Sequence, residues 1–192
     1  MNEEKYSKLI GKLKKRLDEE RFYHTLGVSY TSASLAMKYG FDVDKARLAG
    51  LLHDCAKQYS AKELFDLCKK NGLEITKIES EYPALLHSKY GAFMAEHEFG
   101  TCDIEILNAI KYHTTGRPGM SLLEKIVFVA DYIEPTRAVL PMLSEIRKIS
   151  FEDIDKAVIM ELEMTIEHLK RKNPDGIDPL SIETLSYYKE VH

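Results

Sequence analysis

The chain has 192 residues, of which 44% are hydrophobic and 30% charged, and its formal net charge is −4. This length suits one domain with a substantial buried core. The mild negative charge offers no electrostatic footprint for nucleic acid, and no apolar run is long enough to span a membrane. The N-terminal stretch is charged, and three isolated cysteines are typical of a reduced protein. We therefore expect a cytoplasmic protein with neither nucleic-acid nor membrane partners.

Helix signals recur along the chain, which contains only 10 glycines and 6 prolines. Asp42, Ser60 and Asp103 each precede a helical pattern as N-cap residues, and Gly40 suits the end of a helix. The predicted helices cover residues 4–18, 21–39, 43–54, 61–70, 85–98, 104–113, 122–133, 142–149, 151–172 and 179–189.

The remaining segments show no strand pattern. Residues 73–84 have no clear period and contain Pro83, so they are predicted to form a connecting loop. The short apolar run at 126–129 fits a buried helix turn better than a strand. We predict an all-α fold in which residues 1–192 form a single helical bundle of roughly ten helices.

One stretch, residues 48–57, combines an apolar run with His53, Asp54 and Lys57. On a helix, Lys57 shares a face with His53, one turn away. Imidazole and carboxylate groups are both ligands for divalent transition metals, and a lysine beside them can hold an anion. A His-Asp pair occurs readily by chance in such a chain, so its weight depends on further ligands elsewhere.

Further ligands do occur, each in a different predicted helix: His24, His87, His113 and Asp131. All are flanked by apolar residues and must therefore point into a core, where an unpaired polar group is costly. For any one histidine, an ordinary hydrogen-bonded position is the simpler explanation. For the set, a shared metal site removes the cost from all members together, so the sequence predicts a metal centre.

The order His…His-Asp…His…His…Asp resembles the HD-domain superfamily of metal-dependent phosphohydrolases. More narrowly, the chain is similar to the YqeK-type branch, which hydrolyses diadenosine tetraphosphate symmetrically. The stretches that carry the resemblance are residues 21–28, 49–57, 86–87, 109–116 and 130–137. The match covers about residues 20–150. One departure is Ala138-Val139-Leu140, which is more apolar than the family pattern.

The resemblance implies two divalent metal ions, commonly iron in this branch, with manganese or magnesium as alternatives. His24, His53, Asp54 and Asp131 would hold one ion. His87, His113 and a shared oxygen of Asp54 would hold the other. Mixed nitrogen and oxygen ligands suit iron or manganese, whereas structural zinc sites are rich in sulfur ligands. The metal-binding core would span about residues 20–150, with the helices of 151–190 packed on it, and a homodimer is also implied.

The implied reaction splits diadenosine tetraphosphate into two ADP by attack of a hydroxide held between the metals. Lys57 and Arg137 are our candidates for phosphate clamps, and with Asp54 they form the predicted catalytic set. The predicted substrate contacts are Lys57, Thr114, Gly116, Tyr132 and Arg137. Lys57 follows His53, Thr114 and Gly116 follow His113, and Tyr132 is a candidate for stacking on a base.

Two other functions stay open at this point. The first is a different nucleotide phosphohydrolase of the superfamily, such as a nucleotidase or a cyclic-nucleotide phosphodiesterase. The second is a nucleotide-binding sensor that has lost catalysis, although such modules usually lose ligands and none is missing here. His97, His168 and His192 are predicted to lie away from the site, and Cys55 to be a small packed residue.

Overall fold

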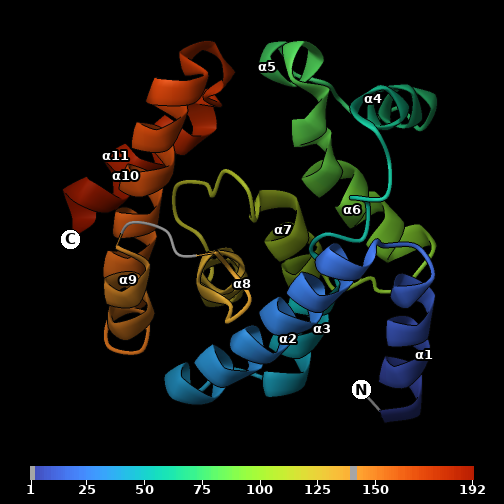
Figure 1. Ribbon diagram of the computed structural model, residues 1–192, viewed down its shortest axis with the longest axis horizontal. Helices are drawn as coiled ribbons and strands as arrows, with labels where there is room; N and C mark the ends of the chain where they lie inside the picture. The colour runs from blue at the N-terminus through green and yellow to red at the C-terminus, as the bar shows by residue number, and fades with distance from the viewer. Residues whose placement is uncertain (1–2, 139–141) are drawn as a thin grey trace.

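The computed structural model describes residues 3–138 and 142–192. Within these ranges the chain forms eleven α-helices and two short 3-10 helices, with no strand (Figure 1). The all-α prediction is therefore confirmed. The helices are α1 (Glu3–Lys14), α2 (Glu19–Tyr39), α3 (Val43–Leu52), α4 (Ala61–Lys70), α5 (Lys77–Glu81), α6 (Leu86–His97), α7 (Ile104–Tyr112), α8 (Leu122–Ile133), α9 (Leu143–Ile149), α10 (Ile154–Lys172) and α11 (Pro179–Val191). The 3-10 helices are Pro83–Leu85 and Pro174–Gly176.

The predicted caps set the helix boundaries. The side chains of Asp42, Ser60 and Asp103 each accept a hydrogen bond from a backbone N–H in the first turn of the following helix. Gly40 ends α2 in the left-handed conformation, with φ of 67°. These local signals acted as the sequence indicated, because a cap needs only neighbours within a few residues.

Several predicted boundaries are wrong. The helix predicted over 43–54 ends at Leu52, and the one predicted over 151–172 begins at Ile154. The first helix ends at Lys14 and not at residue 18, because Asp18 accepts a hydrogen bond from the backbone N–H of Arg21 and so begins α2. The predicted loop at 73–84 contains α5 and a 3-10 helix. Thr76 and Glu79 form a reciprocal capping box that starts α5. A helix of five residues is too short to show an apolar period.

Helix α8 lies at the centre of the fold. It packs against α2, α7 and α10. Figure 1 draws it nearly end-on, with α10 and α11 on one side and α6 and α7 on the other. Residues Ile126–Ala130 are all buried, which explains why this stretch is apolar without a break. This central position brings α8 into contact with α2, α3 and α7 as well as with α10.

Candidate metal centre

The structure brings the six predicted ligands together, although they come from five separate helices. His24 lies in the second turn of α2, His53 and His113 follow α3 and α7 directly, and His87 lies in the first turn of α6. Asp54 follows His53, and Asp131 lies in the last turn of α8. All four histidines and Asp54 are buried, whereas the side chain of Asp131 is 20% exposed. The site is therefore largely buried within the bundle, and only the Asp131 carboxylate is partly exposed to solvent.

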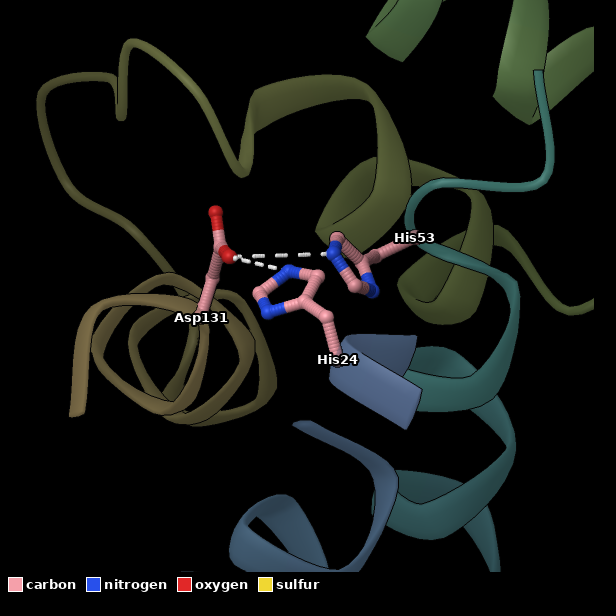
Figure 2. Close-up of side chains that lie close together, drawn as sticks. All are labelled: His24, His53 and Asp131. Atoms are coloured by element: carbon pink, nitrogen blue, oxygen red, sulfur yellow. Dashed lines mark ion pairs between the residues drawn. The ribbon is translucent and has the colours of Figure 1, made fainter. Parts of the chain in front are cut away.

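Two groups of ligand atoms are compact enough to hold an ion. His24, His53 and Asp131 form the first, and His53, Asp54 and His113 form the second, with the ligand atoms of each group within 4.8 Å of one another. Figure 2 shows a carboxylate oxygen of Asp131 facing the ring nitrogens of His24 and His53. These contacts measure 2.9 Å to His24 Nε2 and 3.7 Å to His53 Nε2.

Hydrogen bonds determine which nitrogen of each histidine can bind a metal. The Nδ1 atoms of His53, His87 and His113 each lie 2.7 Å from the backbone carbonyl oxygen three residues earlier. A carbonyl can only accept, so Nδ1 carries the hydrogen and Nε2 keeps its lone pair in the neutral ring. His53 and His113 follow the C-terminal ends of α3 and α7, where the last carbonyls are not used by the helix itself. The acceptor for His87 is Ala84, which belongs to the 3-10 helix just before α6.

The Nε2 lone pairs converge on one another and on carboxylate oxygens. His87 Nε2 and His113 Nε2 are 3.2 Å apart, and they lie 3.5 and 3.4 Å from Asp54 Oδ1. Acceptors that face acceptors repel unless a cation lies among them. The buried atoms without a hydrogen bond include His24 Nε2, His53 Nε2 and Asp54 Oδ1. Buried polar atoms are seldom left without a partner, so these residues fit divalent metal ions.

The electrostatics favour the metal-binding forms of two ligands. Burial opposes ionisation of Asp54, but His53 and His113 lower its pKa well below the ordinary value. Burial, followed by the nearby Lys57 ammonium, lowers the pKa of His87 to about 3. At neutral pH Asp54 is therefore a carboxylate and His87 a neutral imidazole, which are the states that bind metals.

Three cations surround the two carboxylates. Arg21 Nη1 donates to Asp54 Oδ2 at 2.8 Å, and Arg137 Nη2 donates to Asp131 Oδ1 at 2.6 Å. Lys57 is exposed overall, but its ammonium group is largely shielded from water. This shielding lowers the pKa of Lys57, and the nearby Asp54 carboxylate opposes the shift. The centre thus combines metal-ligating atoms with three positive side chains, a combination suited to phosphate groups.

The other predicted substrate residues lie in differing surroundings. Thr114 Oγ1 is 3.2 Å from His87 Nε2, at the edge of the centre. Gly116 is buried with φ of 63°, and a Cβ there would lie 2.8 Å from Thr184 Cγ2, so packing against α11 accounts for this glycine. Tyr132 lines a cavity of about 450 Å³ beside α10.

The residues predicted to lie away from the centre do so. His97 is exposed and stacks on Phe93, and Cys55 is buried, with its thiol directed at the carbonyl of Gly91. His168 and His192 are exposed as well. Of the apolar departure from the family pattern, Val139 and Leu140 lie outside the described residues.

Three site residues had no predicted role: Arg21, Glu134 and Glu161. Arg21 lies three residues before His24 on α2, a spacing that indicates a shared helix face. Glu134 follows Asp131 at the same spacing and accepts from His24 Nδ1 at 3.0 Å. Glu161 lies on α10 with nothing in its local sequence to connect it to the centre. Helical spacing could have found the first two but not the third.

The fold and the site together define the class of protein. The family model of the HD domain matches residues 21–136, and the chain belongs to this family. It is 40% identical over 161 residues to a Bacillus subtilis protein named bis(5'-nucleosyl)-tetraphosphatase, symmetrical, covering 84% of this chain and 86% of the relative. A Staphylococcus aureus protein of the same name is 36% identical over 192 residues, covering 98% and 95% of the two chains.

A solved structure is similar over almost the whole chain. It is a crystal structure from Clostridium acetobutylicum, described as a predicted HD superfamily hydrolase involved in NAD metabolism. The two folds agree with a TM-score of 0.93 at 40% sequence identity, covering 97% of this chain and 98% of that one. The family expected from the motif order is therefore confirmed. No helix among the described residues is long and apolar enough to cross a membrane.

Proposed function

We propose that this protein is a metal-dependent hydrolase that splits diadenosine tetraphosphate symmetrically into two ADP molecules. The observation that carries the proposal is the meeting of four imidazole lone pairs with two carboxylates inside a ring of three cations. The name shared by the relatives from Bacillus subtilis and Staphylococcus aureus supports the substrate and the symmetrical cleavage.

The metal part of the proposal is two divalent ions, with iron first and manganese or magnesium as alternatives. The ligands would be His24, His53, Asp54 and Asp131 for one ion, and His87, His113 and Asp54 for the other. When bound, such ions lower the pKa of a bound water to about 7 and polarise phosphoryl oxygens. Nitrogen and oxygen ligands without sulfur suit iron or manganese.

The three cations hold the polyphosphate in this proposal. Arg21 and Arg137 each donate to a carboxylate that a metal ion would also neutralise. In this proposal the N–H groups of Arg21 and Arg137 would turn from these carboxylates to phosphate oxygens of the substrate. A guanidinium can grip two such oxygens at once. Lys57 supplies a single charge close to Asp54, so it would stabilise the negative charge that develops on the transferred phosphoryl group.

Two cavities suit the two nucleoside ends: one includes His24 of the centre itself, and the other includes Tyr132, the residue after Asp131. One of about 450 Å³ is lined by Tyr132, Met142 and Met164, among others. The other, of about 490 Å³, is lined by Arg21 and Arg137 together with neighbours from α2 and from the segment that follows α8. Apolar and aromatic walls favour a base, and Tyr132 offers its ring for stacking. Thr114 would contact the substrate directly, and Gly116 would act through the shape of its turn.

The test is analysis of the products formed from diadenosine tetraphosphate with iron, manganese or magnesium added in turn. We expect ADP alone, and one label in one of the two ADP molecules when the reaction runs in oxygen-18 water. ATP together with AMP would show asymmetrical cleavage and contradict the proposal. A panel of mononucleotides and cyclic nucleotides run in parallel would reveal a nucleotidase or phosphodiesterase instead.

Two further predictions remain: a homodimer, which the resemblance implies, and a cytoplasmic location, which the composition indicates. Sedimentation of the purified protein checks the dimer. The exposed residues Tyr23, Tyr30 and Met37 follow one another at seven-residue spacing along α2. They are the first positions at which to place charges if a dimer is found.

A further inference from the structure

His24 differs from the other three histidines in what holds its ring. The others stand at helix ends, where a backbone carbonyl accepts from Nδ1. His24 lies six residues inside the 21-residue helix α2, where the backbone carbonyls are engaged in the helix. A side chain from another element must therefore supply the acceptor. That acceptor is Glu134, 110 positions further along the chain, whose Oε1 lies 3.0 Å from His24 Nδ1.

Glu134 is itself held firmly. It is 1% exposed. Thr136 donates its hydroxyl to Oε1 and its backbone N–H to Oε2, both at 2.7 Å. Arg147 donates to the backbone carbonyls of Ile133 and Glu134, each at 2.8 Å. Both carboxylate oxygens already accept hydrogen bonds, so the group can only accept from His24 as well. Asp131 Oδ1, 2.9 Å from Nε2, is an acceptor too, so a neutral His24 ring donates to only one of the two carboxylates. When a metal ion takes the Nε2 lone pair, the hydrogen lies on Nδ1 and is donated to Glu134.

Gly27 makes room for this arrangement. It lies almost one turn beyond His24 on α2, and a Cβ built there would collide with Glu134 Oε2. Glycine inside a helix costs about 1 kcal/mol relative to alanine. Space explains the glycine here, because no side chain fits between α2 and the carboxylate. Gly11 in α1 is different, since a Cβ there meets no atom within 4 Å.

We propose that Glu134 is a positioning residue that fixes the tautomer and direction of the His24 ring as a metal ligand, with Gly27 as the gap that admits it. This inference rests on the proposed metal centre. Glu134 contacts neither Asp54 nor Asp131 through any hydrogen bond of the described structure, so it acts through His24 alone. Acceptors of this kind behind a metal-bound histidine typically account for 10- to 100-fold in metal affinity.

The experiment compares three variants: Gly27→Ala, Glu134→Gln and Gly11→Ala. The first readout is the His24 tautomer, measured by long-range proton–nitrogen NMR in the metal-free protein and in the protein loaded with Mg²⁺, which is diamagnetic. The second is the affinity for each of two Mn²⁺ ions, measured by calorimetry, with circular dichroism as the folding check. In wild type loaded with Mg²⁺ we expect hydrogen on Nδ1 of His24. In Gly27→Ala we expect mixed tautomers and a 10- to 100-fold loss in affinity for one ion only.

The other two variants make the result specific. Glu134→Gln keeps an oxygen that can accept from His24, but its amide NH₂ meets the Thr136 N–H, so we expect a smaller loss than in Gly27→Ala. Gly11→Ala should bind both ions as wild type does. An unchanged tautomer and unchanged affinities in folded Gly27→Ala would overturn the positioning role. A wild-type protein that binds no ion would instead overturn the metal centre, while the tautomer measurement would still test Glu134.

Discussion

Asp54 and Glu161 are both buried carboxylic acids, at 2% and 6% exposure, yet their pKa values move in opposite directions. Asp54 lies among histidines, which lower its pKa well below the ordinary value although burial opposes this. Glu161, on α10, has a buried oxygen without a hydrogen bond. Burial, and then repulsion from Asp131, raise its pKa well above the ordinary value, against the attraction of Arg137.

The difference teaches that burial penalises charge in both places and that the neighbours decide the outcome. At the metal centre, donors and cations from several helices favour two ionised carboxylates. At the α8–α10 contact no such donor reaches Glu161 Oε2 within the described residues. The metal centre therefore stabilises ionised carboxylates that can bind cations, whereas the α8–α10 contact favours the protonated form of Glu161. Four substitutions test this contrast.

The largest effect is expected from Asp54→Ala. Asp54 faces both groups of histidines, so its loss should strip metal and lower activity by roughly a thousandfold or more, while helical content stays largely intact. Elemental analysis, circular dichroism and steady-state kinetics measure the three quantities. Asp66→Ala, at an exposed position on α4, is the matched control. Full metal occupancy in Asp54→Ala would refute the ligand assignment.

Lys57→Met comes next, because it removes a cation and leaves every proposed ligand in place. Loss of one preorganised charge contact costs on the order of 3 kcal/mol, or about a hundredfold in kcat. Both metals should remain bound. Metal content and kinetics are measured on the same preparations, with Lys62→Met at an exposed position on α4 as the control. Turnover at the wild-type rate with unchanged affinity would make Lys57 an ordinary surface lysine.

Arg137→Ala should act more on KM than on kcat. Its guanidinium donates one hydrogen bond to the Asp131 carboxylate and one to the Asp131 backbone carbonyl. When substrate binds, it would donate to phosphate oxygens. Hydrogen bonds to charged groups contribute about 1.5–3 kcal/mol, so we expect kcat/KM to fall by roughly tenfold to a hundredfold. Arg137→Lys keeps the positive charge but cannot donate two parallel hydrogen bonds, so it should recover only part of the lost kcat/KM. A fall in kcat alone would argue against substrate grip.

The smallest effect is expected from Glu161→Gln, and it concerns stability. The unfolded carboxyl loses its proton near pH 4.5, whereas the folded one keeps it to higher pH. The free energy of unfolding of wild type therefore falls as the pH rises from about 4.5 through the folded pKa, and this component is absent in Glu161→Gln. At neutral pH the variant should melt a few degrees higher, since roughly 1 kcal/mol shifts Tm by about 2–4 °C at this size.

Thermal melts at pH 4.5 and pH 7.5 measure this difference. Glu167→Gln, at an exposed position on the same helix, is the control and should show none of it. A Tm difference between wild type and Glu161→Gln that is the same at both pH values would contradict the raised pKa of Glu161.

Much of this protein could be predicted from the sequence because the deciding interactions are local. The capping residues Ser60 and Asp103 act within three positions, so they determined where helices begin. The ligands could be identified because each is a polar residue embedded in an apolar helical pattern, and their order is specific to the family. Helix α5 was missed because five residues carry too little period, although Thr76 and Glu79 carried the cap signal.

The tertiary structure decided the rest, because it depends on contacts between residues distant in the sequence. That Glu134 accepts from His24 follows from the packing of α8 against α2. The opposite shifts of Asp54 and Glu161 likewise depend on which charges each meets across helix contacts. Residue type alone specifies what a side chain can do. Only the assembled helices determine whether a buried carboxyl finds donors, and therefore whether it keeps its charge.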